Sequence, residues 1–122
     1  MMESHTRYAS HFLLLPGYGY LKQMVVELAG GRVKRIFPLM HECEDTVWLP
    51  GLIALPDVDE WYLMSEEPCT VQPLFQVPLL PWSGDLPSSV ASTLIHRMAC
   101  HVTPFDLTLL QPVDGTRHRL LP

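Results

Sequence analysis

A chain of 122 residues has the size of a single domain, and such a domain buries about two thirds of the surface that its unfolded chain exposes. Hydrophobic residues make up 48% of the chain and charged residues only 17%, so some apolar side chains should remain outside the core, and we expect a homo-oligomer. The net charge of −5 argues against a nucleic-acid partner, which normally requires a basic surface.

The cysteines indicate a reducing compartment. Cys43, Cys69 and Cys100 cannot all pair within one chain, and without a secretory signal they are expected to be free thiols. The one apolar run that resembles a signal core, residues 12–15, is interrupted by Pro16 and is far too short for a membrane span. We therefore expect a cytoplasmic protein that does not enter a membrane.

The N-terminal third of the chain predicts strands. The first covers residues 11–15 and is followed by a turn at residues 16–19. Residues 23–29 and 32–37 are apolar and β-prone, and Gly30-Gly31 between them forms a two-residue hairpin loop that accepts positive φ. A further strand at residues 46–49 ends at a Pro-Gly turn.

The hairpin loop fixes an expected register. In a two-residue loop Leu28 faces Val33, and Glu27 faces Lys34 as an opposite-charge pair. This register places Val33 and Ile36 on opposite faces of the strand. Either both faces are partly covered or a β-bulge intervenes.

Prolines dominate the middle of the chain. Between residues 38 and 87 they recur too often for a long helix, so we expect strands, turns and extended segments there. Residues 61–64 and 74–77 are candidates for short strands, and residues 77–82 for an extended edge or interface arm.

One helix is predicted, at about residues 88–101. Ser88 or Ser89 can cap it, and it should end before Pro104. Apolar residues recur along it at helical spacing, namely Ala91, Leu94, Ile95, Met98 and Val102. After the helix, residues 106–110 predict a strand, residues 112–115 a turn and residues 117–121 a last strand. The sequence therefore predicts a mainly β fold with one helix, of the α+β class.

Four motifs follow one another in a specific order. VVEL stands at residues 25–28, GGRV at 30–33, WLPGLI at 48–53 and FDLTLL at 105–110. This order resembles the metal-dependent amidohydrolase superfamily, in which strands from both ends of the chain form a small β-sandwich, the composite domain, beside a catalytic barrel. The resemblance covers residues 10–53 and 88–121, and it implies one sandwich domain built from the N-terminal and C-terminal strands.

The departures from that family imply that its activity is absent. The family places a metal-binding His-x-His pair after its Pro-Gly-x-Ile-Asp motif, whereas residues 53–59 contain no histidine and Ala54 replaces the aspartate. The barrel requires on the order of 200 residues, and the Pro-rich connection 54–87 is far too short for it. We therefore expect no catalytic residues, no metal and no other cofactor.

Two clusters nevertheless contain groups that could carry chemistry. If residues 41–45 are extended, His41, Cys43 and Asp45 share one face, as at the start of a zinc site. A solvated loop is favoured, because a structural site needs four ligands. On the predicted helix, His96 and Cys100 stand at i, i+4 and His101 follows, so an imidazole and a thiolate could converge. We favour Cys100 as a small core residue, because no orienting group or oxyanion site is evident.

Acidic and aromatic residues offer further alternatives. Asp57, Asp59 and Glu60 could hold a cation or act as an acid–base pair, although an exposed loop is the favoured interpretation. Large apolar side chains could line a ligand cleft, but we favour an interface. The interface candidates are Trp61, Tyr62, Leu79, Leu80 and Trp82.

Three functional hypotheses remain open. The first is a non-catalytic structural or binding module that self-associates. The second is a small metal- or thiol-dependent enzyme that uses His41 and Cys43, or His96 and Cys100. The third is a docking partner of a larger enzyme or another protein.

Overall fold

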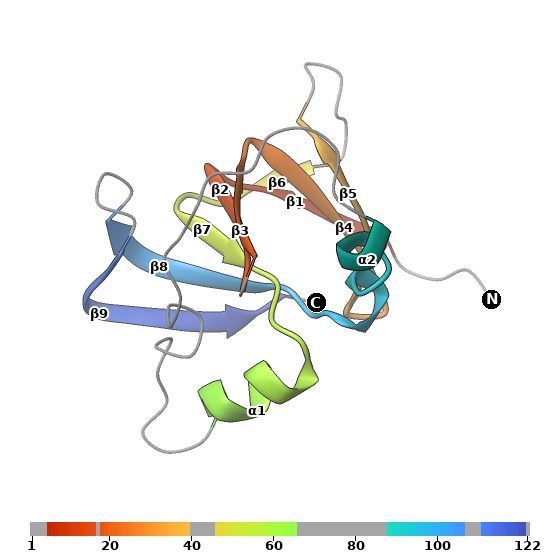
Figure 1. The fold of residues 1–122 in the computed structure, drawn as a ribbon. Helices are drawn as coiled ribbons and strands as arrows, with labels where there is room; N and C mark the ends of the chain where they lie inside the picture. Colours follow the sequence, from red (N-terminus) through yellow and green to blue (C-terminus); the bar gives the residue numbers. More distant parts are fainter. Residues whose placement is uncertain (1–4, 17, 40–45, 66–87, 107–110, 122) are drawn as a thin grey trace.

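The fold is mainly β, as the sequence predicted (Figure 1). The structure is a computed structural model, and it describes residues 5–16, 18–39, 46–65, 88–106 and 111–121. Within these residues no helix combines the length and the apolar composition needed to cross a membrane.

Two mixed sheets make up most of the described chain. The four-stranded sheet has the order β5-β4-β1-β6 and the five-stranded sheet the order β3-β2-β7-β8-β9. The strands of the four-stranded sheet are β1 (His5–Ala9), β4 (Met24–Ala29), β5 (Arg32–Pro38) and β6 (Thr46–Trp48). The strands of the five-stranded sheet are β2 (Phe12–Leu15), β3 (Gly19–Lys22), β7 (Leu52–Ala54), β8 (Cys100–Asp106) and β9 (Gln111–Leu120).

The N-terminal and C-terminal strands share the five-stranded sheet, which confirms that the two ends of the chain come together. β7 lies between the N-terminal and C-terminal strands of this sheet. It is parallel to β2, where Ile53 pairs with Leu13, and antiparallel to β8, where Ile53 pairs with His101. β8 then pairs with β9. The C-terminal strands therefore extend a sheet that the N-terminal half begins.

Two neighbouring segments of the chain each contribute one strand to both sheets. Residues 5–15 contribute β1 and β2, and residues 46–54 contribute β6 and β7, and the segments are parallel in both sheets. At the crossing, the Leu49 N–H donates to the Ala9 carbonyl (2.8 Å) and the Gly51 N–H to Nδ1 of His11 (3.4 Å). These bonds join the two segments to each other where they pass between the sheets.

The β4–β5 hairpin confirms the predicted loop and corrects half of the predicted register. Gly30 and Gly31 both have positive φ (60° and 79°), and Leu28 faces Val33. Glu27, however, faces Arg35 and not Lys34, because the register shifts between Glu27 and Leu28. The extra residue of this bulge brings Ile36 back to the core side, where it packs with Val33.

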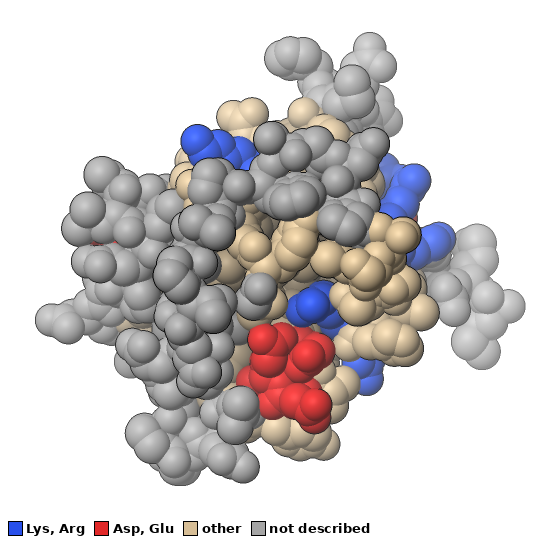
Figure 2. All heavy atoms as spheres, in the orientation of Figure 1, with Lys and Arg blue, Asp and Glu red and all other residues tan. Residues whose placement is uncertain are grey.

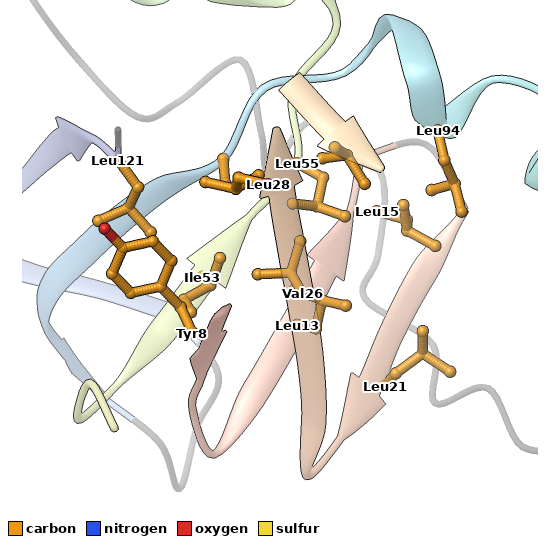
Figure 3. Close-up of a cluster of buried hydrophobic side chains, with 12 residues drawn as sticks. Tyr8, Leu13, Leu15, Leu21, Val26, Leu28, Ile53, Leu55, Leu94 and Leu121 are labelled. Atoms are coloured by element: carbon orange, nitrogen blue, oxygen red, sulfur yellow. The ribbon is translucent and has the colours of Figure 1, made fainter. Parts of the chain in front are cut away.

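The main core lies between the two sheets. Figure 3 shows its side chains pointing toward one another from strands of both sheets and from the segment that follows α2. The buried members are Tyr8, Leu13, Leu15, Leu21, Val26, Leu28, Val33, Ile53, Leu55, Leu94, Ala99 and Leu121.

A second buried cluster covers the outer face of the five-stranded sheet. Met64 of α1 (Val58–Ser65) is fully buried in this cluster, and Trp61 of the same helix packs against the cluster. The strand residues of this cluster are Leu14, Tyr20, Leu52, Ala54, Cys100 and Val102. The helix, the five-stranded sheet and the four-stranded sheet thus form three successive layers.

Helix α1 corrects the prediction that residues 38–87 form only strands, turns and extended segments, with a short strand at residues 61–64. The N–H of Glu60 donates to Oδ1 of Asp57 (2.8 Å), and the N–H of Asp57 donates to Oε1 of Glu60 (3.0 Å). This reciprocal pair is a capping box, which starts the helix directly after Pro56. Frequent prolines exclude long helices, but they leave room for one of 8 residues.

The predicted helix at residues 88–101 is wrong in its length. The chain forms α2 (Ser88–Ala91) and a 3₁₀ turn, η2 (Leu94–His96), and the backbone becomes extended at Arg97. β8 begins at Cys100 and pairs with strands on both sides. Leu94 is buried whereas Ile95 is exposed, so the apolar spacing does not describe one continuous helical face.

The end of the chain also differs from the prediction. β8 passes through Pro104, with a register shift at that position, because proline cannot donate to a strand ladder. β9 runs through residues 112–115, for which the sequence predicted a turn, and it ends at Leu120 as part of the predicted last strand. The segments predicted at 74–77, 77–82 and 107–110 lie outside the described residues.

Candidate functional site

His41, Cys43, Leu79, Leu80 and Trp82 lie outside the described residues. Among the residues that the structure does describe, no group of three His, Cys, Asp or Glu side chains could hold a metal ion.

The predicted convergence of His96 and Cys100 depended on a helix that does not form. His96 is exposed on η2, whereas Cys100 is fully buried in the cluster under α1. His101 follows Cys100 on a strand, where successive side chains point to opposite faces of the sheet. Burial raises the pKa of the Cys100 thiol to about 12. A thiol in this environment packs as a small apolar side chain.

Cys100 is therefore expected to resist alkylation in the folded protein. Relative to the ordinary thiol value of 9.0, a pKa of about 12 lowers the thiolate fraction at pH 8 by about a thousandfold. Iodoacetamide labelling followed by peptide mass spectrometry would report this cysteine separately from the other two. Labelling of the Cys100 peptide should be slow in buffer and rapid in denaturant, and equal rates would contradict the buried position.

His101 lies at the corner where the sheets meet and contacts the turn between β6 and β7. Its Nε2 lies 2.6 Å from the carbonyl oxygen of Pro50. Since a carbonyl only accepts, Nε2 carries the proton. The neighbouring Gly51 has a φ of 101°, and a Cβ there would lie 3.2 Å from the carbonyl oxygen of Val102. The hydrogen bond holds the Pro50-Gly51 turn against β8, and glycine at position 51 allows the turn to approach the strand closely.

The acidic residues at the start of α1 also have structural partners. Figure 2 shows acidic side chains gathered beside a basic one on this face of the molecule. Nη1 of Arg97 donates to the carbonyl of Leu55 (2.8 Å) and lies 3.6 Å from Oε1 of Glu60. Burial raises the pKa of Glu60, despite its bond to the Asp57 N–H. Asp57 and Glu60 therefore cap a helix instead of lying in an exposed loop, and Asp59 is exposed.

Two of the predicted interface residues, Trp61 and Tyr62, lie on α1, where Trp61 contacts β9. Trp61 packs on the buried cluster, and its ring meets that of His118 edge-on at 5.6 Å. Burial lowers the pKa of His118. Tyr62 is 65% exposed and Leu120 is 44% exposed. We call Trp61, Tyr62, His118 and Leu120 the α1–β9 surface.

A charged cluster that was not anticipated from the sequence lies on the outer face of the four-stranded sheet. Arg7, Glu27 and Arg35 stand in register on β1, β4 and β5. Nε of Arg7 donates to Oε1 of Glu27 (3.0 Å), and Nε of Arg35 donates to Oε2 (2.8 Å). Both guanidinium groups also lie over the ring of Phe37, at 5.8 and 4.9 Å from its centre. We call these four residues the arginine cluster.

Exposure differs sharply among the charged members of the arginine cluster. The Glu27 side chain is only 5% exposed, whereas Arg7 is 35% exposed and Arg35 is 57% exposed. Burial raises the pKa of Glu27, but the hydrogen bonds and charges of Arg35 and Arg7 outweigh it and leave the pKa below its usual value. Glu27 is therefore ionised at neutral pH and holds two guanidinium groups at the surface.

An apolar row runs beside the arginine cluster on the same face. Trp48, Ala9, Val25 and Phe37 are paired in register across β6, β1, β4 and β5. Ala9 and Val25 are buried, whereas Trp48 is exposed and its ring meets His11 edge-on at 5.0 Å. Arginines, aromatic rings and a buried carboxylate thus share one sheet face.

One signal in the sequence could have located the arginine cluster. The bulge that was left open for the hairpin moves Arg35, instead of Lys34, opposite Glu27. The pairing of Arg7 with Glu27 had no such signal, because no strand was predicted at residues 5–9.

No protein-family model, no curated protein and no solved structure matches this chain.

Proposed function

We propose that this chain is a non-catalytic structural or binding module of the cytoplasm that self-associates through the α1–β9 surface. The observation that carries the proposal is the exposure of Tyr62 and Leu120 beside the half-buried Trp61. Large apolar side chains that gather on an exposed surface are typical of protein interfaces.

The geometry of this surface supports contact between two copies. Trp61 and His118 lock α1 against β9 through their rings, so the surface is held by the fold. Leu120 pairs with Cys100 and therefore faces the side of the sheet that α1 covers. β9 is the outermost strand of its sheet, so an approaching copy meets a helix and a strand together.

The environment of the candidate catalytic groups supports a non-catalytic role. The thiol of Cys100 is buried, His101 is bonded to the Pro50 carbonyl, and Glu60 caps α1. The composite-domain relation remains part of the proposal, and it is supported by the single sheet that joins β2, β7, β8 and β9.

Light scattering during size-exclusion chromatography tests the self-association. The wild type is expected to elute with a mass of at least twice the 13.9 kDa of the chain. The double variant Tyr62→Ser, Leu120→Ser should shift toward the monomer, because it removes apolar area that a partner copy would cover. Ile95→Ser is the control, since Ile95 is 60% exposed but lies on η2, away from the α1–β9 surface.

Two results would contradict the proposal. If the wild type remained a monomer at high protein concentration, the proposed self-association would be wrong. A shift to monomer with Ile95→Ser, and not with the double variant, would assign the interface to another surface.

A further inference from the structure

We propose that the outer face of the four-stranded sheet binds an acidic segment of a partner protein, whose carboxylates pair with Arg7 and Arg35. This inference concerns a different face from the α1–β9 surface and does not rest on self-association. Its basis is the arginine cluster and the apolar row beside it.

The two arginines are held in place before any ligand arrives. Each is bonded through Nε to one oxygen of the same buried carboxylate, and each lies over the Phe37 ring. A guanidinium carries further donors on its two terminal nitrogens, in a geometry that matches a carboxylate. Since the side chains are already ordered, less conformational entropy is lost when a ligand binds.

The charge of this face is complementary to an anion. Glu27 is the one acidic residue within strands β1, β4, β5 and β6, and it neutralises only one of its two arginine partners. Arg32, which pairs with Ala29, and Lys34 are exposed on β5 of the same sheet. The sheet is therefore a basic region of a chain whose net charge is −5.

The apolar row favours a protein segment over a nucleic acid. Trp48 and Phe37 lie two residues along their strands from the row of charged residues, a separation of about 7 Å. An acidic segment that also carries apolar residues can contact both rows, and arginine and aromatic residues together are the usual hot spots of protein interfaces. The negative net charge of the whole chain opposes the approach of a long polyanion.

Fluorescence anisotropy with a short labelled peptide of repeated Glu-Glu-Leu units tests the proposal. The wild type is expected to bind it at least about tenfold more tightly than a Gln-Gln-Leu peptide of the same length, and more weakly as salt is added. Arg35→Gln should weaken binding about tenfold, because it removes a charge-assisted contact. Arg119→Gln is the matched control, since Arg119 is exposed on β9 of the other sheet, and it should leave the affinity unchanged.

A second variant and a direct measurement separate binding from folding. Arg35→Lys keeps a cation beside Glu27 but lacks the planar guanidinium group. This variant should retain the wild-type circular dichroism spectrum and bind the Glu peptide more weakly than the wild type does. In the wild type, NMR signals of the Nε–H groups of Arg7 and Arg35 should shift on addition of the Glu peptide and not of the Gln peptide.

The outcomes that overturn the proposal are distinct from those for self-association. Equal binding of the two peptides, or an equal loss with Arg119→Gln, would remove the site. Tighter binding of a single-stranded DNA oligonucleotide through Arg35 would assign the face to nucleic acid. Release of monomers by the Glu peptide would assign it to a second copy of this chain, whereas the Tyr62→Ser, Leu120→Ser variant should bind the peptide as the wild type does.

Discussion

Replacing Ile53 with alanine is expected to lower the free energy of unfolding by about 3–4 kcal/mol. Ile53 is fully buried in the main core, on the strand that lies between β2 and β8. The substitution removes apolar contacts to both sheets and leaves a cavity that the paired strands on either side cannot close. Urea denaturation followed by circular dichroism would measure the change.

The matched control uses the same substitution at an exposed position. Ile95 is 60% exposed on η2, so Ile95→Ala should change the free energy of unfolding by no more than about 0.5 kcal/mol. If the two variants were equally stable, β7 would not be the central link between the N-terminal and C-terminal strands. The comparison therefore tests the fold as well as the energy of one side chain.

Replacing Glu27 with alanine is expected to cost about 2–3 kcal/mol at neutral pH. The substitution removes two charge-assisted hydrogen bonds and leaves two guanidinium groups facing each other without their shared carboxylate. Arg35 is more than half exposed, so solvent screens part of this effect. Asp59→Ala is the control, because Asp59 is an exposed acidic residue and its removal should cost less than about 0.5 kcal/mol.

The cost of Glu27→Ala should depend on pH in a defined direction. The pKa of Glu27 in the folded protein lies below the ordinary value of 4.5, so the carboxylate contributes its full stabilisation above pH 4.5. That contribution is lost as the pH falls through the folded-state pKa. The pKa of Glu60 is shifted upward, but Glu60 is present in both proteins, so the difference between them isolates Glu27. A difference that stays constant from pH 7 to pH 3 would contradict the ion pairs.

Local sequence signals predicted four of the seven strands between residues 5 and 54, namely β2, β4, β5 and β6, and missed β1, β3 and β7. The Gly30-Gly31 loop specifies a hairpin because both positions need positive φ, and the structure has it. The strands predicted at residues 11–15 and 46–49 are present to within one residue at their ends, as β2 and β6. In each case neighbouring residues alone carry the information.

The errors arose where a local pattern competed with distant pairing or with a stronger local signal. Residues 94–102 are compatible with a helix, but hydrogen bonding to β7 and β9 makes a strand from Cys100 onward. At α1, the capping box of Asp57 and Glu60 outweighs the general effect of many prolines. The arginine cluster depends on a bulge and on the pairing of β1 with β4, neither of which one segment specifies.

The two segments that cross between the sheets also determine how fast this chain can fold. Their parallel pairing joins residues 7 and 46 and residues 12 and 52, and β7 then joins residues 54 and 100. The loop entropy of each closure is lost before the paired strands return any stabilisation, and a high contact order slows folding. The β4–β5 hairpin closes through a two-residue loop, so it can form early. The contact between His101 and Pro50 joins residues 51 positions apart, so it can form only after β8 has paired with β7.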